Sequence, residues 1–383
     1  MDPSASGVVV AVPRERAAGE RRVALIPASV AALTALDARV AIEPGAGERA
    51  GFTDEAYVEA GAQVVPQAIA GAGVVALVGP PPDELIDALA TGTLVVGFLA
   101  PLSRPDLARK LAGRGVDSLA MELVPRITRA QAMDALSSQA TVAGYRAVLL
   151  AAYSLPRFFP MLMTAAGTIR PAKVLVLGAG VAGLQAIATA RRLGAVVSAF
   201  DVRPAVREQV ESLGATFLEI ELPEGGEGEG GYAGELSQET ARRQQELLAL
   251  HVAASDAVIT TALVPGRPAP MLVTSQMVDA MPAGAVIVDL AAEAGGNCEA
   301  TVPGEDVVRG SVTILGPRNP AAGMPMHASQ LYARNVSALL ALAITGGAVT
   351  LDPDDAVIAG ACLTRGGEVV HPAVAALLAA SSA

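Results

Sequence analysis

A glycine-rich hexapeptide near the middle of the chain has the residue types and the spacing to hold a pyrophosphate. It runs from Gly178 to Gly183, follows a short apolar run, and has glycine at its first, third and sixth positions. The first glycine permits a tight turn, the second lets the backbone approach an anion, and the third allows a helix to pack closely on a strand. The N–H groups that begin the following helix would then face the phosphates.

A carboxylate about 20 residues further on completes this pattern. Asp201 follows a second apolar run at 196–200. A carboxylate at that place accepts hydrogen bonds from both hydroxyls of a ribose and repels a 2′-phosphate, which favours NAD(H) over NADP(H). Arg203 and Arg207 argue the other way, because a nearby arginine accommodates that phosphate. A glycine-rich turn that binds no ligand is the alternative interpretation.

A second candidate site is a polar stretch within residues 121–145. Arg126, Gln131, Asp134 and Ser137 lie there in close order. Asp134 and Ser137 are ordinary residues for the start of a helix, so a solvated helix start is one interpretation. A ligand-binding loop is the other, and composition alone favours the helix start.

Composition narrows the classes of function. The chain has 383 residues, is 52% hydrophobic and only 3% aromatic, and carries a formal net charge of −11, which argues against nucleic-acid binding and against an anionic membrane surface. No uncharged run is long and uninterrupted enough to span a membrane, and no signal peptide is visible. The two cysteines are isolated and fit a reducing, cytoplasmic setting. Neither they nor the histidines have metal-ligand spacing, so no metal site is expected: His251, His327, His371, Cys298 and Cys362.

The elements around these candidate sites alternate between strands and helices. Strands are predicted at 8–12, 39–42, 63–65, 74–78, 94–98, 173–177, 196–200, 216–220, 257–261 and 286–290. Helices are predicted at 29–36, 54–60, 105–114, 138–158, 181–193, 237–253 and 329–344, with Pro156 ending or kinking the fourth. This alternation predicts an α/β fold with two Rossmann-like domains that have parallel sheets, are joined by long helices and leave a cleft between them. We expect a discontinuous first domain, 1–136 plus 325–383, and a nucleotide-binding domain at 140–322.

Several longer motifs resemble one family. They are VPRE and RRVALIP near the N-terminus, RITRAQAMDALSSQ from Arg126, ITTALVPGRPAP from Ile259 and VDLAAEAGGNC from Val288. With the glycine motif they resemble the NAD(H)-binding domain I of proton-translocating NAD(P) transhydrogenase, in the form in which it is a separate alpha-type subunit. The resemblance covers nearly the whole chain.

The resemblance implies which residues bind the cofactor and which act in the reaction. Arg126, Asp134 and Ser137 would hold the nicotinamide end of NAD(H), and Gln131 would reach toward a nucleotide on a partner. Tyr232 stands on a loop rich in glycine and glutamate at 224–235, where an aromatic side chain is interpreted either as a lid that closes over the ligand or as an ordinary surface tyrosine. The implied cofactor-binding set is Gly178, Gly180, Val181, Ala182, Gly183, Asp201, Val202, Arg203, Tyr232, Thr261, Ala262, Leu263, Pro265 and Gly266.

The implied reaction is direct hydride transfer from NADH on this chain to NADP⁺ held by a partner subunit. Such a step needs two nicotinamide rings placed close together with water excluded, and it needs no proton donor at the reacting carbon. Proton pumping would belong to membrane-spanning subunits. The resemblance therefore implies a homodimer that is cytoplasmic, does not insert into the membrane, and lies on the inner face of the cell membrane through its partners.

Two other functions remain as alternatives, an alanine dehydrogenase-like enzyme and a non-catalytic NAD-binding regulator. Alanine dehydrogenase shares the fold and binds its keto acid through an arginine that Arg14 matches. The positions of its lysine and its catalytic histidine are Leu77 and Phe98 in this sequence. Leucine and phenylalanine neither protonate a carbonyl nor hold a carboxylate, which weighs against reduction of a small substrate.

Overall fold

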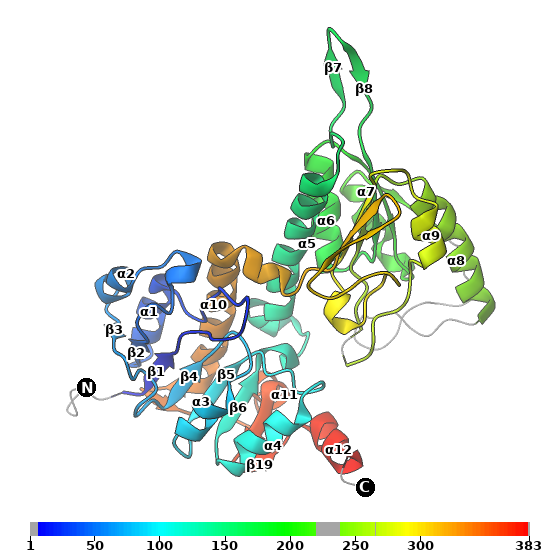
Figure 1. Ribbon diagram of the computed structural model, residues 1–383. Coiled ribbons are helices and arrows are strands. Elements are labelled where there is room, and N and C mark those ends of the chain that lie inside the picture. The colour runs from blue at the N-terminus through cyan, green and yellow to red at the C-terminus, as the bar shows by residue number, and fades with distance from the viewer. Residues whose placement is uncertain (1–6, 220–237, 265, 382–383) are drawn as a thin grey trace. The chain divides into compact units, whose positions relative to one another are not determined.

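The computed structural model describes residues 7–219, 238–264 and 266–381 and divides into two compact units (Figure 1). The first unit comprises Met1–Gln139 and Ala322–Ala383, and the second comprises Ala140–Ala321. Each unit has its own sheet, covered on both faces by helices and apolar clusters. The loop predicted as a lid, including Tyr232, lies outside the described residues, as does Pro265.

The first unit contains an eight-stranded sheet in the order β19-β18-β6-β5-β4-β1-β2-β3. The three central strands of its parallel part, β1, β4 and β5, are fully buried and rich in valine, as expected for strands covered on both faces. The strands are β1 Val9–Val12, β2 Arg39–Ile42, β3 Gln63–Val64, β4 Val74–Ala76, β5 Leu94–Gly97, β6 Asp117–Ala120, β18 Cys362–Arg365 and β19 Glu368–Val369. The helices are α1 Pro27–Thr34, α2 Asp54–Glu59, α3 Asp83–Ala88, α4 Pro105–Gly113, α10 Pro325–Ala343, α11 Ala356–Ala361 and α12 Pro372–Ala380.

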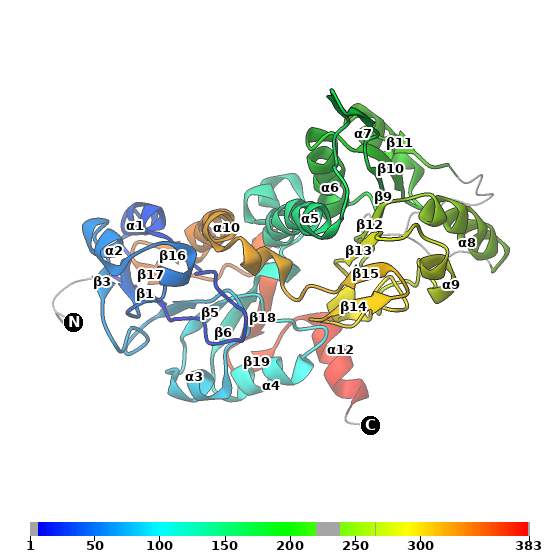
Figure 2. The same cartoon turned by 45° about the horizontal axis from the view of Figure 1, so that its top comes forward.

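The second unit contains a seven-stranded sheet in the order β11-β10-β9-β12-β13-β15-β14. Helices α8 and α9 lie side by side over one face (Figures 1 and 2), while α6 and α7 contribute to the apolar cluster on the other. The strands are β9 Lys173–Leu177, β10 Val196–Phe200, β11 Thr216–Phe217, β12 Ala257–Thr260, β13 Val286–Asp289, β14 Asp306–Arg309 and β15 Val312–Leu315. The helices are α6 Val181–Arg192, α7 Arg207–Ser212, α8 Gln238–Ala253 and α9 Ser275–Asp279.

Helix α5, Ala135–Ser154, begins in the first unit and continues into the second. It starts three residues before the predicted start and ends before Pro156, because a proline lacks the N–H that the next turn requires. A two-stranded hairpin follows it, β7 Leu162–Thr164 and β8 Gly167–Ile169, which projects from the second unit (Figure 1).

The structure corrects several sequence predictions. Both sheets carry antiparallel strands at one edge, β18 and β19 in the first and β14 in the second. Gly310, at φ +59°, permits the tight turn between β14 and β15, and this glycine is the local sequence signal for the antiparallel strand of the second sheet. Helix α10 begins at Pro325 rather than at residue 329, since proline is well suited to the first turn of a helix. The β7–β8 hairpin, helix α12 and a short pair, β16 Ile344–Thr345 with β17 Ala348–Val349, were not predicted.

Candidate functional site

The turn between β9 and α6 has a backbone that only glycine fits well. Gly178 has φ +99°, a conformation that side chains rarely allow, and a Cβ there would lie 2.7 Å from Oγ1 of Thr261. A Cβ at Gly183 would overlap the carbonyl oxygen of Gly178, so this glycine lets α6 approach the strand closely. Gly180 precedes the first residue of α6, and no side chain hydrogen bond caps that end of the helix. The turn is therefore a cradle of backbone groups at a helix N-terminus, which suits a pyrophosphate.

The carboxylate of Asp201 ties this turn to the end of β10. Its Oδ2 accepts a hydrogen bond from the N–H of Ala179 at 2.7 Å. The side chain of Arg203 makes a two-point ion pair with it, since Nε lies 2.9 Å from Oδ1 and Nη2 lies 2.9 Å from Oδ2. Val202, between them, is half-buried against the apolar cluster under α8. The predicted ribose acceptor therefore lies beside the glycine turn, and Arg203 is bound directly to it.

The loop that follows β12 lies against the same turn. The N–H of Thr261 donates to the carbonyl of Leu177 at 2.8 Å, and its Oγ1 donates to the carbonyl of Gly178 at 3.0 Å. The next residues, Ala262 and Leu263, run on from this contact, and the Leu263 side chain is 46% exposed. Gly266 has φ +72° and turns the loop. The second unit thus brings together the described members of the predicted cofactor set.

Two supporting residues, which the sequence places near the ligand-binding edge of the sheet, were given no role in the predicted site. Asp289 is fully buried at the end of β13 and accepts hydrogen bonds from Oγ1 of Thr260 at 2.8 Å and from the N–H of Asn297 at 2.8 Å. Asn297 in turn holds the loop that follows β12 by two hydrogen bonds: its Oδ1 accepts from the N–H of Ala262, and its Nδ2 donates to the carbonyl of Ala262. The signal in the sequence was the pair of glycines before Asn297, which have φ +100° and +83° and turn the chain back toward β12.

All of these residues follow the carboxyl ends of neighbouring parallel strands. Gly178, Asp201, Thr261 and Asp289 come at or directly after the ends of β9, β10, β12 and β13. The chain order reverses beside β9, with β10 on one side and β12 on the other. Ligands of open α/β sheets bind outside such a reversal, so the second unit has the geometry of a dinucleotide site.

The polar stretch of the first unit forms a short 3₁₀ helix, Thr128–Met133, and then the start of α5. Asp134 caps α5, since Oδ1 accepts from the N–H of Ser137 at 2.9 Å and Oδ2 accepts from its Oγ at 2.6 Å. The helix-start interpretation therefore describes Asp134 and Ser137 correctly. It does not account for Gln131 and Arg126, whose side chains are exposed.

Two anchors hold the loop that carries Gln131. On one side Arg129 makes a two-point ion pair with Asp355, both distances being 2.8 Å, and this hydrogen bonding lowers the pKa of Asp355 to about 2. On the other side the buried Asn335 of α10 donates from Nδ2 to the carbonyl of Ala132 at 2.8 Å. Gln131 lies between the two anchors, so the chain presents an exposed amide from a loop that is held on both sides.

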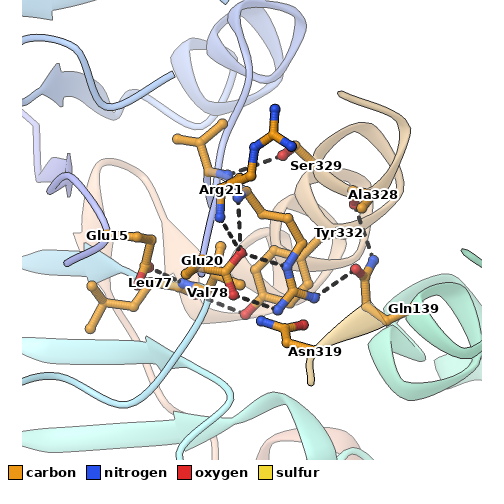
Figure 3. Close-up of polar contacts among 12 residues, drawn as sticks. Glu15, Glu20, Arg21, Leu77, Val78, Gln139, Asn319, Ala328, Ser329 and Tyr332 are labelled. Atoms are coloured by element: carbon orange, nitrogen blue, oxygen red, sulfur yellow. Dashed lines mark hydrogen bonds and ion pairs between the residues drawn. The ribbon is translucent and has the colours of Figure 1, made fainter. Parts of the chain in front are cut away.

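A buried polar network fixes the start of α5 in the first unit (Figure 3). Arg22 pairs with Glu20 at 2.7 Å and donates to Oε1 of Gln139 at 2.8 Å. Gln139 then donates from Nε2 to the carbonyl of Ala328 on α10 at 3.1 Å. A buried charge pair is costly unless its hydrogen bonds are satisfied. Here Gln139 accepts one of the hydrogen bonds of Arg22, and it lies on α5, the helix that directly follows the loop of Gln131.

Two family models match the chain in sequence. The model described as "Alanine dehydrogenase/PNT, N-terminal domain" matches residues 11–143, and "Alanine dehydrogenase/PNT, C-terminal domain" matches residues 147–372. The chain belongs to this family. The prediction from the sequence motifs is confirmed, and so is the predicted α/β class with two Rossmann-like domains.

Within the alanine dehydrogenase/PNT family the chain is more similar to transhydrogenase subunits than to a dehydrogenase. An NAD(P) transhydrogenase alpha-subunit chain of Rhodospirillum rubrum is 46% identical over 377 residues, covering 95% of this chain and 98% of that protein. A crystal structure of transhydrogenase from Sinorhizobium meliloti is 45% identical with a TM-score of 0.87, covering 94% of this chain and all of that one. Alanine dehydrogenase of Bacillus subtilis is 29% identical over 381 residues, covering 96% of this chain and 94% of that protein.

Leu77 and Phe98, at the positions that the resemblance assigns to the lysine and histidine of alanine dehydrogenase, are apolar and packed. Leu77 is 2% exposed, and its carbonyl accepts a hydrogen bond from the hydroxyl of Tyr332 at 2.8 Å (Figure 3). Phe98 packs on the Tyr332 ring, with 5.2 Å between the ring centroids. A hollow of about 460 Å³ does lie beside Arg14, Glu15 and Leu77. Leu77 gives this hollow no acid or base, but the carboxylates of Glu15, Asp83 and Glu84 also line it.

Among the described residues, no helix is long and apolar enough to cross a membrane.

Proposed function

We propose that this chain is the NAD(H)-binding component of a proton-translocating NAD(P) transhydrogenase and passes hydride directly between NADH bound here and NADP⁺ bound by a partner subunit. The observation that carries the proposal is a dinucleotide cradle kept in a chain whose positions for keto-acid chemistry are Leu77 and Phe98. These two residues favour a hydride acceptor other than a keto acid. The 45–46% identity with transhydrogenase alpha subunits supports a second nucleotide in that role.

The second unit fits NAD(H) because its glycines shape a backbone turn at a helix N-terminus. A Cβ at Gly178 or Gly183 would collide with the protein itself, whereas a Cβ at Gly180 would have only Nη2 of Arg203 within 4 Å, so the backbone there is open to a ligand. NAD(H) supplies the hydride carrier, and the chain supplies binding and orientation. Gly180 and the N–H groups of Val181, Ala182 and Gly183 would face the pyrophosphate. Asp201, Val202 and Arg203 would surround the adenosine ribose. The remaining proposed contacts come from the loop after β12 and from the lid: Thr261, Ala262, Leu263, Pro265, Gly266 and Tyr232.

The anchored loop of the first unit would align the reacting ring. Arg126, Asp134 and Ser137 would hold the carboxamide and the neighbouring phosphate of the nicotinamide half. Gln131, exposed between its two anchors, would reach the nucleotide of the partner. Loop rigidity matters because a hydride moves between rings only at near-contact distance with water excluded.

The hairpin supports the proposed homodimer. A two-stranded hairpin is at best marginally stable alone in water, and β7–β8 carries Met163, which is 77% exposed, while Tyr153 near the end of α5 is 91% exposed. We propose that a second copy of the chain covers them. Membrane-spanning and NADP(H)-binding subunits would hold the cytoplasmic dimer on the inner face of the cell membrane.

A reconstitution experiment tests the function. The chain is mixed with the NADP(H)-binding subunit, and reduction of an NADP⁺ analogue by NADH is followed with and without that subunit. We expect transfer only in the mixture, and no oxidation of NADH by pyruvate with ammonium. Pyruvate-dependent oxidation would establish the dehydrogenase alternative. NADH binding without either reaction would establish the regulator.

A further inference from the structure

The carboxylate of Asp201 has no acceptor position left for a ribose. Four hydrogen bonds from described groups end on it, and a carboxylate offers about four such positions. Oδ1 accepts from the N–H and from Nε of Arg203, both at 2.9 Å. Oδ2 accepts from the N–H of Ala179 at 2.7 Å and from Nη2 of Arg203 at 2.9 Å. A ribose hydroxyl that donates to Asp201 must therefore displace one of these donors.

Of these donors, only the side chain of Arg203 can move away without a change in the backbone. The N–H of Ala179 belongs to the tight turn that Gly178 fixes, and the N–H of Arg203 belongs to the backbone that follows β10. The arginine side chain is 20% exposed and has a flexible stem, whereas Asp201 is 6% exposed. When the guanidinium leaves, one acceptor position opens on each carboxylate oxygen. The adenosine ribose of NAD(H) has two neighbouring hydroxyls, which is the number of donors that these positions accept.

We propose that Arg203 is a displaceable latch on the ribose site, and that it sets both the affinity for NAD(H) and the selectivity against NADP(H). The proposal rests on the proposed function, in which NAD(H) binds to the second unit. Because the binding-competent state is then only a fraction of the population, the measured affinity for NADH is weakened by that fraction. The latch also neutralises the charge of Asp201, which reduces the repulsion of a 2′-phosphate.

If Arg203 is a latch, removing its charge should strengthen NADH binding, whereas a phosphate-binding arginine would weaken nucleotide binding when removed. An arginine near a nucleotide is expected to bind a phosphate, and a Cβ at Gly180 would lie 3.9 Å from Nη2 of Arg203, so the guanidinium is close to the phosphate turn. If phosphate binding were its role, removal of the charge would weaken NADH or NADPH. If it competes with the ribose, removal of the charge strengthens NADH alone.

The experiment compares Arg203→Met with Arg207→Met in the full chain. Arg207 is the matched control, because it loses the same charge nearby but pairs with Glu211 at 3.1 Å and with Glu219 at 2.9 Å on the exposed surface. Dissociation constants for NADH and for NADPH are measured by calorimetry at one ionic strength. A minor state populated at 0.1–10% corresponds to a gain of about 10- to 1,000-fold, so we expect Arg203→Met to bind NADH at least about tenfold more tightly. NADPH should bind no more tightly, and Arg207→Met should stay within about twofold of wild type.

Arg203→Lys is a second variant that tests the proposal if the methionine variant folds poorly. Lysine keeps the charge but loses the two-point contact, so its affinity for NADH should lie between those of wild type and Arg203→Met. Equal or weaker NADH binding in the folded Arg203 variants, with NADH still bound by wild type, overturns the latch and leaves the proposed function intact. Failure of the wild-type chain to bind NADH overturns both.

Discussion

Replacing Asn297 by alanine should loosen the cofactor loop and destabilise the second unit together. The side chain is fully buried and makes three hydrogen bonds, with the N–H of Ala262 at 3.0 Å, the carbonyl of Ala262 at 2.9 Å and the carbonyl of Pro270 at 2.8 Å. A net contribution of about 1 kcal/mol for each bond gives about 3 kcal/mol, before the cost of the backbone groups that are left unpaired. For a unit of this size that loss lowers the Tm by roughly 6–12 °C.

Asn297→Asp is the informative companion variant. It keeps the shape of the side chain and the acceptor for the N–H of Ala262, but it places a carboxylate oxygen against the two carbonyls. It also adds a negative charge close to Asp289, which is fully buried. We therefore expect Asn297→Asp to unfold at or below the Tm of Asn297→Ala. Gln276→Ala, an exposed amide on α9, serves as the control and should change the Tm by less than about 2 °C.

Thermal unfolding followed by circular dichroism measures the stability, and calorimetry measures NADH affinity at a temperature where both variants remain folded. We expect weaker binding in Asn297→Ala, since Ala262 continues directly from the residue that touches Gly178. A Tm within about 2 °C of wild type would refute the hydrogen-bond argument. A normal Tm shift with unchanged NADH affinity would refute the connection between Asn297 and the nucleotide site.

Three further predictions concern the first unit. Gln131→Asn should leave NADH binding by calorimetry intact and reduce hydride transfer in the reconstituted complex about 10²-fold, because the shorter amide misplaces the ring by about 1 Å; equal effects on both would contradict its role. Asn335→Ala should also slow transfer, since the carbonyl of Ala132 loses its anchor, and it should add little in a chain that already carries Gln131→Asn. Burial raises the pKa of Glu15 from 4.5 to about 7, so the folded chain holds this proton more tightly and its stability falls as the pH rises between those values. Glu15→Gln should remove that part of the slope in urea unfolding at pH 5 and pH 8, and an unchanged slope would show that Glu15 does not titrate there.

The sequence predicted those parts of the site that depend on local geometry. The glycines of the β9–α6 turn, the acid after β10 and the strands themselves follow from spacing and apolar runs, which act over a few residues. The antiparallel edge strands were missed for different reasons: β18 pairs with β6 from a distant part of the chain, whereas the β14–β15 hairpin was overlooked although its turn glycine is a local signal. The start of α10 was misplaced because a tertiary contact at Ala328 and a proline decide it, rather than apolar periodicity.

The residues that support the site were beyond local prediction. Asn297 acts on Ala262 across 35 positions of sequence, and Asn335 acts on Ala132 across 203. Nothing in the immediate neighbourhood of Asn335 distinguishes it from an ordinary polar residue on a helix. Arg203 is a different case, since the sequence raised it as an argument about a 2′-phosphate. Only the structure shows that its guanidinium pairs with Asp201 and takes up one acceptor position on each carboxylate oxygen.

Leu77 and Phe98, at the positions that the resemblance assigns to dehydrogenase chemistry, already have packing roles in this chain. Leu77 is buried in an apolar cluster with Val75, Ile86 and Leu99, and its backbone carbonyl already binds Tyr332. A lysine introduced there would give up the apolar packing of Leu77 and would border the hollow beside Arg14 and Glu15. A histidine in place of Phe98 would give up its packing on the Tyr332 ring. A single substitution at either position would therefore disturb existing packing, whereas the proposed transfer between two bound nucleotides requires no acid or base there.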